Sequence, residues 1–103
     1  MFDVTLRAAV EADPAFRQAL LQEAVQTMLD GDVATAKSVL RDYINATIGF
    51  ERLADATGTP AKSLMRMFGR PGNPTAENLL GVISVLQKQT GVHLEVAAVA
   101  DAA

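Results

Sequence analysis

The sequence predicts an all-α protein, a bundle of five or six helices with a segment near the C-terminus that could form a short strand. Two observations predict this class: apolar residues recur every three or four positions along most of the chain, and glycine or proline separates the periodic segments. The chain has 103 residues, of which 50% are hydrophobic and 20% charged, so it is long enough for one modest core.

Residues 1–48 are expected to form an N-terminal helical extension packed on the main domain. Asp13-Pro14 is a typical helix start, with Asp as the N-cap and Pro at the first helical position. Apolar residues then follow a helical spacing from Phe16 to Leu29. The turn Asp30-Gly31-Asp32 ends this helix and caps the next one. We therefore expect helices at about 14–29 and 33–47, with Gly49 ending the second helix or lying in the following turn.

Residues 49–96 are expected to form the main domain, from shorter pieces. Helices are predicted at 50–57, at 61–68 with Thr59-Pro60 as its N-cap and first-turn proline, and from about 73–75 to 89, closed by Gly91. The segment His93–Val96 alternates polar and apolar residues, which predicts a short strand. Residues 97–103 are small and are expected to be a frayed tail.

The two short helices around Gly58 have the spacing of a helix-turn-helix unit. Two helices that cross steeply over a tight turn need a small residue at their contact, which Ala54 supplies, and a turn position that tolerates positive φ, which Gly58 supplies. Leu64 and Met67 then anchor the inner face of the second helix. These four residues form the expected scaffold.

The outer face of the second helix is basic, and no acidic residue occurs between positions 59 and 76. In DNA-binding helix-turn-helix proteins the second helix enters the major groove, where Arg and Lys bind the O6 and N7 atoms of guanine. Backbone N–H groups at a helix start suit a phosphate. The expected base-reading residues are Lys62, Ser63 and Arg66, and the expected phosphate-binding residues are Arg52, Arg70, Asn73 and Thr75.

The run GFERLADATGTPAKSLMRMFG, followed by NPTAENLLGVISVLQ, resembles the helix-turn-helix domain of the lambda-repressor-like (Cro/CI, XRE) regulators. A narrower resemblance covers the Asp-Gly-Asp turn and the segment SLMRMFGRPGNPTAENLLGVISVLQKQTGVHLEV, which is similar to the addiction-module antidote proteins of the HigA type. In those proteins a helix-turn-helix antitoxin binds its own operator and a RelE/ParE-like toxin that cleaves RNA. The resemblance implies a lambda-repressor-like fold, regulation of transcription, and an antitoxin in a toxin–antitoxin pair.

The expected partners are double-stranded operator DNA and a second copy of the chain, joined through the C-terminal strand or the N-terminal helices. The alternative is a protein-interaction module of the same fold that has lost DNA binding, because Pro60, Ala61 and Met65 occupy positions where polar base-reading side chains are common. A net charge of −3 argues against indiscriminate coating of nucleic acid.

Other classes of protein find no support in the sequence. There is no cysteine, and the single histidine, His93, has no metal-ligand pattern or nucleophile around it. We therefore expect no enzyme, no cofactor and no metal. The absence of cysteine fits a cytoplasmic location, and no apolar run approaches the roughly 20 residues that span a bilayer.

Overall fold

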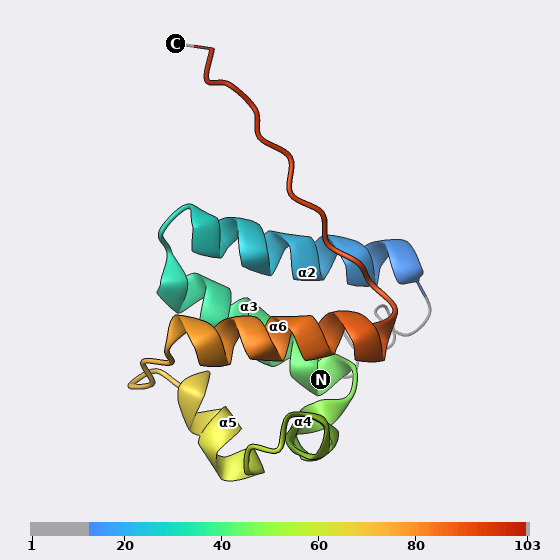
Figure 1. The fold of residues 1–103 in the computed structure, drawn as a ribbon, viewed down its shortest axis with the longest axis vertical. Helices are drawn as coiled ribbons and strands as arrows, with labels where there is room; N and C mark the ends of the chain where they lie inside the picture. The colour runs from blue at the N-terminus through green and yellow to red at the C-terminus, as the bar shows by residue number, and fades with distance from the viewer. Residues whose placement is uncertain (1–12, 103) are drawn as a thin grey trace.

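The computed structural model describes residues 13–102. This part of the chain forms five helices, which follow the apolar periodicity of the sequence (Figure 1). They are α2 (Pro14–Leu29), α3 (Val33–Ala46), α4 (Gly49–Thr57), α5 (Ala61–Met67) and α6 (Ala76–Thr90). The prediction of an all-helical protein is confirmed for this part of the chain. The first twelve residues of the expected N-terminal extension, and residue 103 of the expected tail, lie outside the described residues.

The starts of α2, α3 and α6 follow from local side-chain caps, whereas α4 and α5 begin without one. The carboxylate of Asp13 accepts a hydrogen bond from the N–H of Ala15 at 3.0 Å, and that of Asp32 accepts one from the N–H of Thr35 at 3.1 Å. The hydroxyl oxygen of Thr75 caps α6 in the same way. Such caps satisfy N–H groups that have no partner within the helix, which is why the expected boundaries hold to within one to three residues.

Two expected boundaries are wrong in detail. Gly49 neither ends α3 nor lies in the turn; it is the first residue of α4, with φ +78°. Pro60, rather than Thr59, is the N-cap of α5, and its carbonyl oxygen accepts the first helical hydrogen bond, from the N–H of Leu64 at 3.0 Å. Thr59 belongs to the turn instead, because its N–H donates to the hydroxyl oxygen of Thr57 at 3.3 Å.

The expected C-terminal strand is also wrong, since residues 13–102 contain no strand. The segment after α6 is extended, but a strand needs a neighbour for its hydrogen-bond ladder. The N–H of Leu94 donates instead to the side-chain oxygen of Gln87 at 2.8 Å, and Val92 packs in the core. Beyond this point the chain runs away from the body as an exposed tail (Figure 1).

A single core joins the two halves of the chain. Helix α2 packs on α3, α3 on α4, and α4 on both α5 and α6. The Tyr43 hydroxyl and the Thr90 hydroxyl lie 2.7 Å apart and hydrogen-bond α3 to the end of α6. The largest fully buried side chains come from all five helices or their ends: Leu21, Leu40, Tyr43, Ile44, Leu53, Leu64, Phe68 and Leu86. Burial of a leucine or phenylalanine stabilises a fold by roughly 1.5–3 kcal/mol, so these contacts hold the short helices in place.

Candidate nucleic-acid interface

The interface begins with the contact between α4 and α5. Helix α5 has seven residues, too few to be stable alone, so it depends on apolar anchors. Leu64 is 1% exposed, and the Phe68 ring lies 6.3 Å from the Phe50 ring, tilted by 53°. Gly58 takes the left-handed conformation (φ +76°) between the helices, where an L side chain would be strained.

The four expected scaffold residues occupy this contact. Ala54 and Met67 are half-buried and pack against the core, Leu64 is buried, and Gly58 forms the turn. The opposite face of α5 is left to solvent as a result.

The solvent face of α5 carries the expected base-reading side chains. Lys62, Ser63 and Arg66 are exposed, and Lys62 and Arg66 lie four residues apart on one face. Met65 is also exposed on this helix, with 49% of its surface accessible. Neither Lys62 nor Arg66 forms an ion pair with another described residue, so an incoming anion would not have to displace a carboxylate.

A groove of about 350 Å³ lies between α5, the loop after it and the start of α6. It brings together four of the seven residues expected to contact DNA, from positions twelve residues apart in the sequence: Ser63, Arg66, Asn73 and Thr75. The remaining lining comes from Met67, Pro71, Gly72, Pro74 and Asn78. None of these described lining residues is acidic.

Asn78 is a groove residue that sequence reasoning missed. Its backbone N–H donates to the hydroxyl oxygen of Thr75 at 3.1 Å, and it lies in the first turn of α6. The spacing of three residues from Thr75 is the one signal in the sequence that could have indicated it. Both an amide and a hydroxyl at this position can donate to a phosphate oxygen.

Lys37 fixes the loop that forms the wall of the groove, a role that no sequence pattern indicates. Its side chain is 7% exposed, and its ammonium nitrogen donates to the carbonyl oxygens of Gly69 at 3.1 Å and Gly72 at 2.5 Å. Gly72 itself packs against the end of α5, where a Cβ atom would lie 2.1 Å from the carbonyl oxygen of Arg66. The loop therefore has a fixed path past α5.

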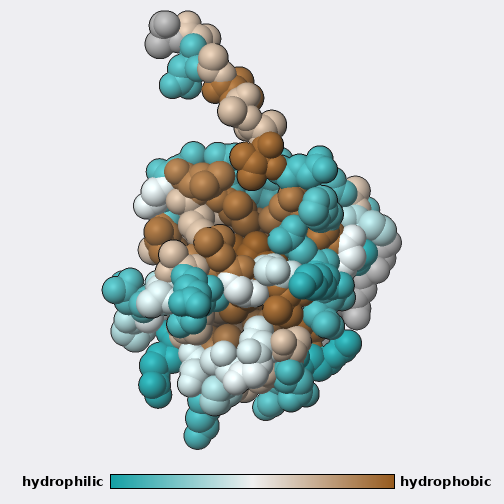
Figure 2. All heavy atoms as spheres, in the orientation of Figure 1, coloured by the Kyte–Doolittle hydropathy of each residue, from teal (hydrophilic) through white to brown (hydrophobic). Residues whose placement is uncertain are grey.

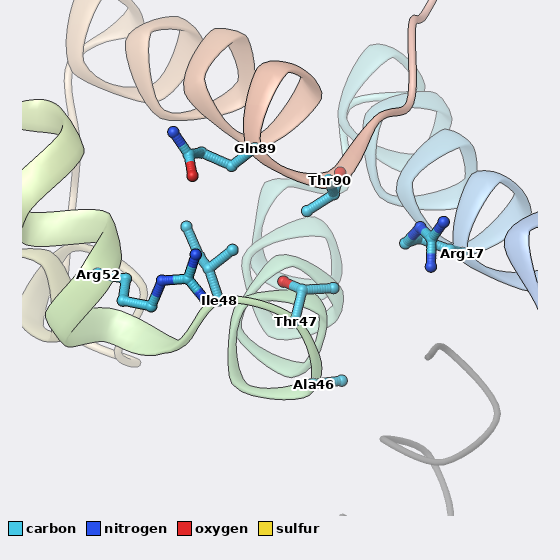
Figure 3. Close-up of a pocket in the computed structure, with 7 residues that line it drawn as sticks. All are labelled: Arg17, Ala46, Thr47, Ile48, Arg52, Gln89 and Thr90. Carbon is cyan, nitrogen blue, oxygen red and sulfur yellow. The ribbon is translucent and has the colours of Figure 1, made fainter. Parts of the chain in front are cut away.

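Arg52 lies apart from the other expected phosphate-binding residues. It lines a shallow hollow of about 270 Å³ with Arg17, the α3–α4 connection and the end of α6 at Gln89 and Thr90 (Figure 3). Gln89 and Thr75 are separated by about 21 Å along α6, at 1.5 Å per residue. Arg70, by contrast, lies on the same loop as the groove but faces α3.

No helix among residues 13–102 combines the length and apolar character needed to cross a membrane. Comparison of the chain with protein-family models, with curated protein sequences and with solved structures found no match.

Proposed function

We propose that this protein is a sequence-specific DNA-binding regulator of transcription, in which α4 and α5 form a helix-turn-helix unit. The observation that carries the proposal is the groove beside α5, which brings Ser63 and Arg66 together with Asn73 and Thr75 and has no acidic side chain among its described lining residues. These side chains can donate hydrogen bonds to base edges and phosphates, and they come from elements that pack against one core.

In this mechanism the exposed face of α5 lies in the major groove. Arg66 and Lys62 donate to guanine O6 and N7, and Ser63 donates to or accepts from a neighbouring base. The start of α6, with Asn73 and Thr75, faces a backbone phosphate, where free N–H groups favour an anion. Phosphate contacts set the position of α5 on the duplex, and its side chains then read the sequence.

Two recognition helices are needed for a palindromic operator, so the proposal includes a homodimer with half-sites about 34 Å apart. Figure 2 shows hydrophobic side chains gathered over the face formed by α2, α6 and the start of the tail. Exposed apolar residues on these elements include Leu29, Leu80 and Val96, with 71%, 61% and 93% of their surface accessible. A second copy would cover this face and give the extended tail a strand partner.

The resemblance to HigA-type antidote proteins extends the proposal to an antitoxin that represses its own operon. A RelE/ParE-like toxin is then the expected protein partner. If the adjacent reading frame encodes such a toxin, co-expression of the two proteins tests this part. Co-purification, together with relief of the growth arrest that the toxin causes, supports it. Independent elution with continued growth arrest refutes it.

DNA binding is tested by fluorescence anisotropy with the duplex upstream of the gene, a scrambled duplex, and two salt concentrations. We expect tighter binding to the upstream duplex, weakening as salt rises. Arg66→Ala should lower affinity by about 1–3 kcal/mol for the upstream duplex alone, as expected for a base contact. Lys88→Ala is the matched control, because Lys88 is an exposed cation in the last turn of α6. Equal, weak binding to both duplexes would refute the proposal.

The second candidate is a protein-interaction module of the same fold. It is favoured by Met65, which is half-exposed in the middle of the proposed reading helix and offers no hydrogen bond to a base. In that case Met65→Ala would weaken a protein complex recovered by pull-down, and Arg66→Ala would leave the weak DNA binding unchanged.

A further inference from the structure

A second groove, separate from the one beside α5, lies between α3 and the loop that follows α5. Its volume is about 440 Å³, within the range of roughly 300–1,000 Å³ that small-molecule sites occupy. Its lining is Ala34, Thr35, Lys37, Ser38, Arg41, Phe68, Gly69 and Arg70. Among the part of the chain that the structure describes, the lining thus contains three cations, two hydroxyls and no carboxylate.

The three cations reach the groove for a structural reason. Lys37 and Arg41 are one turn apart on α3, with Ser38 between them on the same side, and Arg70 comes from the loop that Lys37 holds. Fixing the loop therefore also fixes the distance between Arg70 and α3. Arg41 and Arg70 remain exposed at the rim, whereas Lys37 is buried in the wall.

The charge of Lys37 is not balanced by any described residue. Its ammonium donates to two carbonyl oxygens, which leaves one of its three N–H donors without an acceptor, and it forms no ion pair. Arg41 and Arg70 also have no ion-pair partner among residues 13–102. A buried charge is costly unless an opposite charge or hydrogen bonds compensate it. Two acids flank this stretch of α3. Asp32, the N-cap, already accepts the N–H of Thr35, and Asp42, within the helix, is not among the groove's lining residues and forms no ion pair with a described residue.

We propose that this groove binds a phosphate group. The arginine side chains suit the oxygens of a phosphate because a guanidinium presents paired donors, and the hydroxyls of Thr35 and Ser38 supply further donors. The phosphate comes either from the DNA backbone, which rests on the proposed function, or from a small phosphorylated molecule that binds independently of DNA.

The test has one arm without DNA. Pyrophosphate is titrated into the ¹⁵N-labelled full chain, and amide chemical shifts are followed. We expect shifts at Thr35, Ser38, Gly69 and Arg70, and an affinity weakened about tenfold or more in Arg41→Gln, the loss expected for a charge-assisted contact. Arg41 is exposed, so this substitution leaves the fold intact. Lys88→Gln, the same loss of charge on α6, is the control and should bind like the wild type.

The second arm measures operator binding against salt. If the phosphate belongs to DNA, Arg41→Gln lowers the slope of log K against log salt by about one while Lys88→Gln does not. If the phosphate belongs to a small molecule, Arg41→Gln leaves the slope unchanged but still weakens pyrophosphate binding. An absence of pyrophosphate shifts together with an unchanged slope overturns the proposal. Failure of the wild type to bind DNA would refute the regulator alone, since the first arm still decides the groove.

Discussion

The Gly72→Ala substitution should destabilise the protein more than the addition of a single methyl group would suggest. The substitution adds one methyl group at a position whose φ is not in the left-handed region, so the backbone itself accepts alanine. The added Cβ, however, would lie 2.1 Å from the carbonyl oxygen of Arg66 and 2.6 Å from that of Met67. Real Cβ contacts under 3.0 Å essentially do not occur, so the loop has to move away from α5 by about 1 Å.

This movement has a cost that can be estimated. It pulls the Gly72 carbonyl away from the Lys37 ammonium, now 2.5 Å distant, and a hydrogen bond to a charged donor contributes about 1.5–3 kcal/mol. Alanine recovers about 0.4–1 kcal/mol by restricting the unfolded chain. With residual steric strain, we expect a net loss of about 1–3 kcal/mol, the usual range for overpacking. The corresponding fall in Tm is about 5–20 °C for a domain of this size.

Gly81→Ala is the matched control. Gly81 lies within α6, and a Cβ atom there would meet nothing within 4 Å. The same chemical change should therefore stabilise the protein, by up to about 1 kcal/mol, because alanine favours a helix over glycine.

Urea unfolding followed by circular dichroism at 222 nm measures both variants against the wild type. The expected result is a lower midpoint for Gly72→Ala and a higher one for Gly81→Ala, with similar slopes. A Gly72→Ala protein as stable as the wild type would refute the reasoning, because the loop would then not be held against α5 by Lys37.

Three further predictions concern the helix start, the core and the tail. Hydrogen bonds from the side chain and backbone of Thr35 lower the pKa of Asp32 from its ordinary 3.8. The carboxylate therefore stabilises the fold at neutral pH, and this contribution disappears as pH falls through the lowered pKa. Asp32→Ala should lower Tm at pH 7, and the difference in Tm from the wild type should close in acid. The hydroxyl of Thr90 already donates to a carbonyl of its own helix at 2.7 Å, so the Tyr43 hydroxyl must be the donor in the hydrogen bond to Thr90. Tyr43→Phe removes this donor and should lower the free energy of unfolding in urea by about 1 kcal/mol. An unchanged midpoint would contradict this hydrogen bond. Cutting the chain after Glu95 should yield monomers in sedimentation velocity, whereas a surviving dimer would rule out the tail as the interface.

The local features of this protein were predictable from the sequence because they depend on residues at most a few positions apart. The caps at Asp13 and Asp32 act on N–H groups two and three residues away, and helical spacing correctly identified Leu64 as a buried anchor of α5. The exposed positions of Lys62 and Arg66 follow from the same spacing.

The tertiary structure alone decided which of these residues meet. Lys37 binds carbonyl groups 32 and 35 residues further along the chain, a contact that no local pattern indicates. The same packing separates Arg52 from the groove beside α5 and turns Arg70 towards α3. A strand cannot be decided locally either, since its hydrogen bonds need a second segment, and for His93–Val96 none of the described residues supplies one. Spacing along one helix determines which face a residue occupies, but its neighbours depend on how the whole core closes.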